Sequence, residues 1–269
     1  MNVLTLESGP PTPAGVFNAL LGGWTHSRAD GTAATRMRRV VPDIGHVVRE
    51  TLLFASHAVG WATEPGLRQM IEVGVPGEVE VATPARHLRD IWYSDPPRVV
   101  AVEDDPLLGR RHLRGYDKVV KASINDPADL LDQLHLKSGL DLDEPVIVLM
   151  TGLLRPLHDP TKVMTLLRTR LAPGSTLILA HATSTGVDPA RINGVVKALG
   201  CPNGHAELLF RPQEDIAALV ADSGWERVGP LLCDVHDWSP LRPPQGPVAG
   251  ATIRVLGQVA TIPYTDRSR

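Results

Sequence analysis

A strand, a glycine turn and a second strand that ends in acids most constrain what this chain folds into. Residues 70–73 form a short apolar run that leads into the turn at 74–77, which holds two glycines and a proline. A second apolar run, residues 99–102, ends on the three acids 103–105. This order is typical of a βαβ nucleotide-binding unit, in which the turn brings the backbone close to the ligand and the acid binds a ribose. A βαβ corner without a ligand is the alternative, since one glycine turn is a weak signal.

Strands and helices alternate along most of the chain. The further expected strands are residues 118–122, 145–150, 175–180, 225–235 and 251–260. The expected helices are residues 13–21, 35–61, 106–114, 127–136, 159–171, 189–199 and 213–223, and Pro42 divides or kinks the second of them. Residues 145–150 are apolar at nearly every position, as in a strand covered on both faces of a parallel sheet. We predict an α/β fold: an open, mostly parallel sheet of seven strands, with helices on both faces and a terminal hairpin.

Composition excludes several classes of protein. The chain has 269 residues, of which 43% are hydrophobic, and this is enough to bury a large core. A net charge of −3 with scattered Lys and Arg gives nucleic acid no basic stripe to bind. No apolar run approaches the ~20 residues of a membrane span. We therefore expect a cytoplasmic protein that binds neither nucleic acid nor membrane.

Cysteine and histidine spacing gives no support for a disulfide framework or a metal site. Cys201 and Cys233 are the two cysteines and have no CxxC spacing. No pair of histidines has metal-ligand spacing. We expect two reduced cysteines and no metal.

The N-terminal part reads as a helical lid ahead of the sheet. We expect residues 1–65 to form this lid segment and residues 66–269 to form a Rossmann-like unit. Residues 24–30 read as a polar loop, and we expect residues 20–30 to fold over the carboxyl edge of the sheet and to reach a substrate through Trp24 or His26. The alternative for this loop is a solvated connection.

Several phrases, in a shared order, resemble one family over residues 16–260. They are Asn18 with Leu20–Leu21–Gly22–Gly23 and Ala29–Asp30, Ile71–Glu72–Val73–Gly74, Val102–Glu103–Asp104–Asp105–Pro106, Asn125–Asp126–Pro127, the run from Leu171 to Thr183, Phe210–Arg211 and Trp238. The chain resembles the actinobacterial S-adenosylmethionine-dependent methyltransferases that were once a family of unknown function. The resemblance implies the class I methyltransferase fold, S-adenosylmethionine as cofactor and a role in secondary metabolism, such as antibiotic biosynthesis.

The chain departs from the family pattern at three positions of the expected site. Pro76 stands in place of the second glycine of the turn, and proline removes a backbone N–H that a ligand would use. Ser123 stands where such folds carry an acid for the adenine amino group. Arg155 stands in place of a histidine, and His158 is displaced to the next turn. A site changed this much is compatible with the same fold and a different chemistry.

The resemblance assigns the cofactor to the ends of the first three strands. Glu72 ends a buried strand, where an unpaired carboxylate costs several kcal/mol, so it needs a partner. That partner is the amino group of the cofactor, a lid residue, or, in a purely structural reading, Arg28 or Arg36. Glu103 is expected to bind the ribose hydroxyls, with a solvated turn as the alternative. The remaining expected cofactor-binding residues are Gly23, Gly74, Asp104 and Ser123.

Substrate and catalytic residues are expected on the same edge. Arg155 and His158 follow the fourth strand and His181 closes the fifth, and ligands of open sheets bind at the carboxyl ends of strands. Surface positions without a role are the alternative.

Three classes of function stay open. The first is a methyltransferase that acts on a small natural product. The second is an enzyme of the same fold with non-methylating chemistry, such as a cyclase or isomerase. The third is a non-catalytic binding protein. A homodimer is compatible with each of them.

Overall fold

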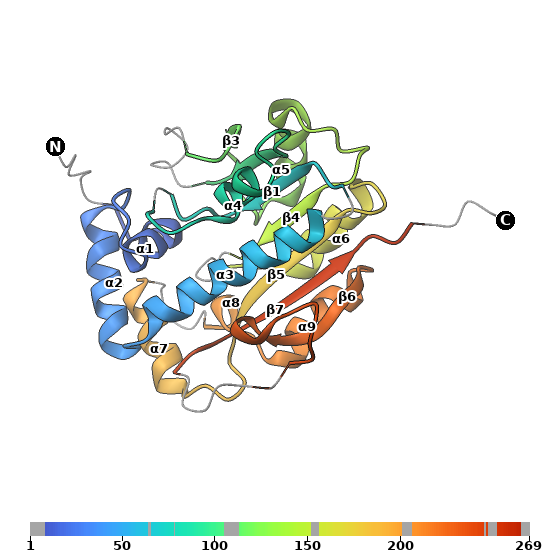
Figure 1. Ribbon diagram of the computed structural model, residues 1–269. Helices are drawn as coiled ribbons and strands as arrows, with labels where there is room; N and C mark the ends of the chain where they lie inside the picture. Colours follow the sequence, from blue (N-terminus) through green and yellow to red (C-terminus); the bar gives the residue numbers. More distant parts are fainter. Residues whose placement is uncertain are drawn as a thin grey trace.

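The computed structural model describes residues 9–63, 66–77, 79–104, 113–151, 156–200, 206–244, 246 and 252–264. Seven strands form one sheet in the order β3-β2-β1-β4-β5-β7-β6 (Figure 1). The strands are β1 Gln69–Val73, β2 Arg98–Val102, β3 Lys118–Val120, β4 Ile147–Met150, β5 Thr176–Thr183, β6 Glu226–Asp234 and β7 Arg254–Thr261. The first five strands pair in parallel, and β7 pairs antiparallel with both β5 and β6. The predicted open, mostly parallel sheet with a terminal hairpin is confirmed.

Proline and a capping side chain fix the start of many helices. The helices are α1 Pro13–Leu20, α2 Arg28–Val40, α3 Ile44–Thr63, α4 Pro84–Ile91, α5 Pro127–Gln133, α6 Pro160–Arg170, α7 Pro189–Ala198, α8 Ala206–Leu209 and α9 Gln213–Asp222. In α1, α4, α5, α6 and α7 a Thr or Asp accepts a hydrogen bond from the first turn, and proline follows it. Proline is preorganised for this position, and the cap pairs one of the free N–H groups of the helix start.

The central strands β1, β4 and β5 are buried on both faces, so alternate side chains of the sheet enter two separate cores. Met70 and Ala101 belong to the core that α1 to α4 and α7 cover. Ile71 and Val100 belong to the core that α5, α6 and α9 cover. In Figure 1 the long helix α3 crosses one face of the sheet, and it contacts β4, β5 and β7. Helices on both faces are therefore confirmed.

The structure corrects the expected N-terminal boundaries. Ser27 and Asp30 form a capping box, in which each side chain accepts a hydrogen bond from the backbone of the other. Helix α2 therefore begins at Arg28, and the interpretation of residues 24–30 as a loop is wrong for its last three residues. The expected division at Pro42 is confirmed, because α2 ends at Val40 and α3 starts at Ile44.

Helix α1 is packed into the molecule by a buried carboxylate. Asp30 is fully buried and accepts hydrogen bonds from the backbone N–H groups of Thr12 and Ser27, both at 2.7 Å. It lies so close to α1 that a Cβ on Gly15 would be 2.1 Å from its Oδ2. One apolar core contains Val16 of α1 and residues of β1 alike. The division of the chain after residue 65 stays a prediction.

Three further differences concern the middle of the chain. The expected helix 106–114 falls mostly outside the described residues, and its last two residues are not helical. The expected helix 127–136 passes after Gln133 into a π-helical turn, Leu134–Ser138. The helix of the first βαβ unit, α4, begins only at Pro84, so it does not start on the glycine turn. The turn therefore lacks the helix N-terminus that commonly follows it.

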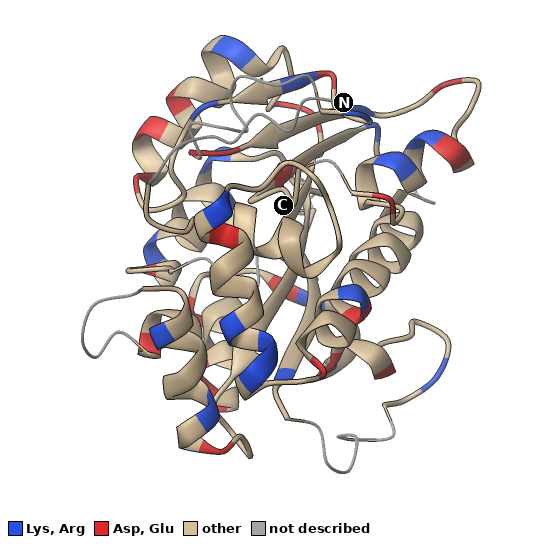
Figure 2. Cartoon of the chain, turned by 90° about the vertical axis from the view of Figure 1, so that its left-hand side faces the viewer, with Lys and Arg blue, Asp and Glu red and all other residues tan. Residues whose placement is uncertain are grey.

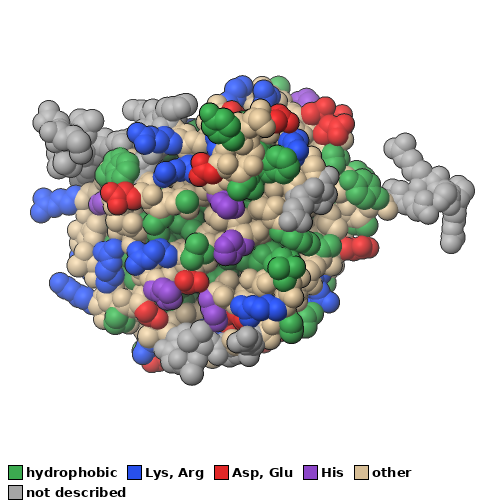
Figure 3. All heavy atoms as spheres, in the orientation of Figure 1, with side chains coloured by type: hydrophobic (Ala, Val, Ile, Leu, Met, Phe, Trp, Pro, Cys, Tyr) green, Lys and Arg blue, Asp and Glu red, His purple; other side chains and the backbone are tan. Residues whose placement is uncertain are grey.

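The surface is mixed in charge and polarity. Figure 2 shows Lys and Arg interspersed with Asp and Glu over the described helices of that side. On the face shown in Figure 3 hydrophobic side chains reach the surface between charged ones. Among the described residues no helix is both long and apolar enough to cross a membrane. Cys233 is a free, buried thiol, and Cys201 lies outside the described residues.

We expect Asp30→Ala to lower the free energy of unfolding by about 2–4 kcal/mol, because two backbone N–H groups lose a charged acceptor. Urea denaturation measures this change. The matched control is Asp132→Ala, which removes an exposed carboxylate on α5 and should change stability by less than about 0.5 kcal/mol. Equal stability of the two variants would show that Asp30 does not hold α1.

Candidate functional site

Glu72 is a buried carboxyl group at the carboxyl end of β1. It is 1% exposed and shares the face of the sheet that α1 to α4 cover. Its Oε2 accepts a hydrogen bond of 2.8 Å from the hydroxyl of Tyr116. Burial raises the pKa of Glu72 from 4.5 to about 7, and the Tyr116 hydrogen bond lowers it in part. No ion pair joins Glu72 to Arg28, Arg36 or any other cation in the part of the chain that the structure describes, so the purely structural salt bridge is wrong.

The turn after β1 has the backbone conformation that the sequence predicts. Gly74 has φ of +80°, a left-handed conformation that favours glycine. Its N–H donates to the carbonyl of Val102 at 3.0 Å, which closes the sheet hydrogen bonding between β1 and β2. The carbonyl of Pro76, two residues on, accepts a hydrogen bond from Asn18 of α1 at 2.8 Å. The turn is therefore hydrogen-bonded to the N-terminal segment through the backbone carbonyl of its proline.

The acids after β2 lie beside Glu72, because β1 and β2 are parallel neighbours. Glu72 pairs with Ala101 and Val73 with Val102, so Glu103 follows directly at the same edge. Glu103 is 1% exposed, and its Oε1 accepts from the N–H of Asp104 at 3.0 Å. Asp104 is exposed and accepts a hydrogen bond from the Ser123 hydroxyl at 3.0 Å. The structure thus brings together Glu72, Gly74, Glu103, Asp104 and Ser123.

The N-terminal loop meets this edge through Asn18. Its Oδ1 accepts from the N–H of Thr25 at 3.0 Å and lies 3.1 Å from Nδ1 of His26. Gly23 packs directly on it, since a Cβ there would be 2.4 Å from Asn18 Nδ2. His26 and Gly23 are therefore held near the glycine turn. Trp24 is 55% exposed.

The structure does not bring the expected catalytic residues together with the cluster around Glu72. His158 is exposed after β4, and its N–H donates to the side chain of Asn125 at 3.0 Å. His181 is 6% exposed in β5, where its Nδ1 lies 2.8 Å from the carbonyl of Ala182. Burial lowers the pKa of His181 to about 4, so it is neutral near pH 7. Its neighbours Ala180 and Ala182 face the core that contains Met70, so His181 and Glu72 point to opposite faces of the sheet. Arg155 lies outside the described residues.

Sequence reasoning missed the two residues that complete this arrangement. Tyr116 lies 44 positions from Glu72 in the chain, and its phenol carries no motif. Asn18 belongs to a family phrase that carries no role for it, yet it is a fully buried amide in an apolar helix. A polar residue in the middle of a buried apolar helix requires partners, and this was the available signal.

The arrangement fits S-adenosylmethionine and gives no support for a metal. Among the described residues no group of three His, Cys, Asp or Glu side chains is placed to hold a metal ion. A buried, uncompensated carboxyl group such as Glu72 is suited to a cationic group of a ligand. Gly74 and Glu103 lie beside it at the carboxyl edge, where open α/β sheets bind nucleotides.

The family model of the S-adenosyl methyltransferases matches residues 2–263, nearly the whole chain. The chain belongs to this family. Its cofactor is S-adenosylmethionine, as the sequence resemblance implied. No curated protein matches the chain.

Two solved structures show that this chain shares its fold with actinobacterial proteins. The "putative methyltransferase" of Thermobifida fusca YX is 24% identical, with a TM-score of 0.78 and coverage of 95% of this chain and 96% of the other. A DUF574 family protein of Streptomyces avermitilis MA-4680 is 22% identical, with a TM-score of 0.73 and coverage of 97% and 100%. The predicted class I methyltransferase-like fold is confirmed.

The raised pKa of Glu72 makes the stability of this protein depend on pH. An unfolded Glu72 titrates near 4.5 and the folded one near 7, so between these values the folded state binds more protons. The contribution of Glu72 to stability therefore falls as pH rises from 4.5 to 7. Glu72→Gln removes this titration, and the stability of the variant relative to wild type should grow over this window by up to about 3 kcal/mol.

Urea denaturation at pH 5 and pH 8 measures this difference. Tyr116→Phe is the companion variant: loss of its hydrogen bond raises the pKa of Glu72 further, so the stability of this variant continues to fall at higher pH than that of the wild type. A difference between Glu72→Gln and wild type that is the same at both pH values would contradict the assignment.

Proposed function

We propose that this protein transfers a methyl group from S-adenosylmethionine to a small natural-product molecule at the carboxyl edge of the sheet. One observation carries the proposal. Glu72 and Glu103 are buried carboxyl groups at the ends of adjacent parallel strands, with the left-handed Gly74 between them. The bound cofactor supplies an electrophilic methyl group on a sulfonium.

In this proposal the ends of β1 to β3 hold the cofactor. Glu72 binds its amino group, and the approach of that cation favours the ionised carboxylate. Glu103 accepts hydrogen bonds from the two ribose hydroxyls. Asp104 and Ser123, already joined by a hydrogen bond, border the adenine side. Gly23 lets the N-terminal loop approach, because a side chain there would collide with Asn18.

The acceptor molecule is placed on the side of the N-terminal loop and the loop after β4. Trp24 offers an exposed ring and His26 an imidazole held by Asn18. Arg155 and His158 are the proposed catalytic residues, where a histidine accepts a proton from a weakly acidic acceptor. His181 is a separate candidate on the other face of the sheet: its Nδ1 donates to the Ala182 carbonyl, so Nε2 is the acceptor of this neutral ring. Alignment of acceptor and methyl group supplies much of the rate acceleration.

We expect Glu103→Ala to weaken S-adenosylhomocysteine binding by roughly tenfold or more, because two hydrogen bonds to a charged acceptor are lost. Isothermal titration calorimetry measures the dissociation constant. Asp132→Ala is the control with an equal change of charge and should bind as wild type does. If Glu103→Ala keeps the wild-type affinity, the ribose does not lie at Glu103.

Methyl transfer itself is tested with methyl-labelled S-adenosylmethionine and extracts of actinobacterial natural products. We expect label in a small molecule, and we expect His158→Ala to lower the rate while S-adenosylhomocysteine affinity stays unchanged. A product of changed structure without label would replace the methyltransferase with a cyclase or isomerase. Cofactor binding with no product of either kind would leave a non-catalytic binding protein.

A further inference from the structure

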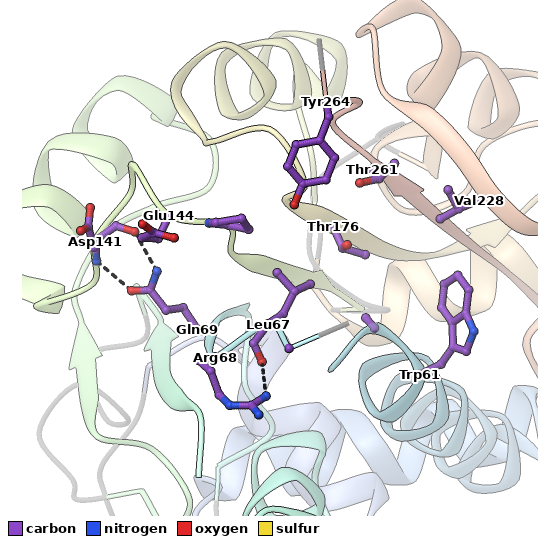
Figure 4. Close-up of a pocket in the computed structure, with 14 residues that line it drawn as sticks. Trp61, Leu67, Arg68, Gln69, Asp141, Glu144, Thr176, Val228, Thr261 and Tyr264 are labelled. Carbon is purple, nitrogen blue, oxygen red and sulfur yellow. Dashed lines mark hydrogen bonds between the residues drawn. The ribbon is translucent and has the colours of Figure 1, made fainter. Parts of the chain in front are cut away.

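A cavity lies at the edge of the sheet opposite to Glu72 and Gly74. Its volume is about 650 Å³, within the range of small-molecule sites. The residues around it come from the starts of β1, β4 and β5, the end of α3 and both strands of the hairpin (Figure 4). We propose that this cavity binds a small organic cation that carries an apolar body.

Hydrogen bonds hold the walls of the cavity in place. The side-chain amide of Gln69 both donates to and accepts from the backbone of Asp141, each at 2.8 Å. On the other wall the N–H of Gly174 donates to the carbonyl of Ile262 at 2.7 Å. Gly174 has φ of +87°, and a Cβ there would be 2.2 Å from the hydroxyl oxygen of Tyr264. The two walls are thus preformed, which lowers the cost of binding.

One end of the cavity is acidic. Asp141 and Glu144 are exposed at this end, and neither carboxylate forms an ion pair with a cation in the described part of the chain. The one cation of the lining, Arg68, is engaged elsewhere. Its guanidinium lies 3.9 Å from the centre of the Trp92 ring and 3.7 Å from Asp95. Figure 4 shows the Arg68 side chain directed away from the two acids. The charged groups of the lining that face a ligand are therefore the carboxylates of Asp141 and Glu144.

The other end of the cavity is apolar, and the hydroxyl of Thr176 lies between the acidic and the apolar end (Figure 4). Trp61 and Val228 line this end, and Leu67 lies between them and the acids (Figure 4). Thr176 is 7% exposed and lines the cavity, and its hydroxyl makes no hydrogen bond with the described residues. The hydroxyl therefore keeps its hydrogen-bonding capacity for a ligand atom in the cavity.

The order of these groups selects the ligand chemistry. An amine at the acidic end leaves its apolar body to cover Leu67 and the ring of Trp61, with the Thr176 hydroxyl within the cavity. An anion of the same shape would meet two like charges and is disfavoured. Because the site lies at the amino ends of the strands, it is separate from the cofactor edge, and its ligand binds whether or not S-adenosylmethionine is present.

The test uses phenethylamine as probe, with 2-phenylethanol and 3-phenylpropionate as its neutral and anionic counterparts. Backbone amide shifts of ¹⁵N-labelled full-length protein report the site. We expect phenethylamine to shift the resonances of residues 67–69 and 176, with a dissociation constant on the order of 1 mM for so small a molecule. The neutral and anionic probes should bind more weakly, in that order.

Variants at exposed positions decide whether the carboxylates select the cation. Asp141→Asn and Glu144→Gln should each weaken phenethylamine about fivefold. The matched control is Asp143→Asn, an exposed neighbour that does not line the cavity and should bind as wild type does. Saturating S-adenosylhomocysteine should leave the amine affinity unchanged, so failure here is distinct from failure of the methyltransferase proposal. Absence of shifts at these residues, equal binding by the acid variants, or stronger binding of the anion would overturn the inference.

Discussion

The parallel register of β1, β2 and β4 is the constraint on which both edges of this molecule depend. Three successive residues of β1, Met70 to Glu72, pair with β4, and the whole of β1 pairs with β2. Strands aligned in this way end together, so whatever follows each strand is brought to a common edge. Glu103 and Ser123 follow β2 and β3 and meet the turn after β1 for this reason. The same alignment at the other ends brings Gln69, Pro145 and Thr176 around one cavity.

The N-terminal segment is joined to this sheet by two buried polar side chains. Asn18 links α1 to the loop at 23–26 and to the turn after β1, and Asp30 links the starts of α1 and α2. Burial of an amide or a carboxylate is costly unless its hydrogen bonds are made, and each of these side chains makes several. Each also faces a glycine, Gly23 or Gly15, that leaves room for it. The segment therefore contributes structure to the site as well as covering it.

The strands and most helices could be predicted because their signals are local. Apolar runs predict the strands, and a proline after a capping residue predicts helix starts such as that of α5. The contacts that define the site are not local. Tyr116 reaches Glu72 across 44 positions and Asn18 reaches Pro76 across 58, and no residue pattern specifies either contact. The cavity at the amino ends of the strands is lined by several segments that are far apart in the chain, so no local sequence pattern predicts it.

The carboxyl and amino edges of the sheet differ in how much their polar side chains lower the stability of the folded state. At the carboxyl edge Glu72 is fully enclosed, and its pKa of about 7 records the free energy needed to ionise it there. Substitutions at that edge therefore alter stability and binding together, as is common where a functional group is held in an unfavourable environment. At the amino edge Asp141 and Glu144 are exposed, and their charges are solvated. β1 joins the two edges through a span of roughly 10 Å from Gln69 to Glu72. Because this strand is buried and paired on both sides, a change of charge at the amino edge is separated from the cofactor edge by a rigid element, and binding at each edge can be altered alone.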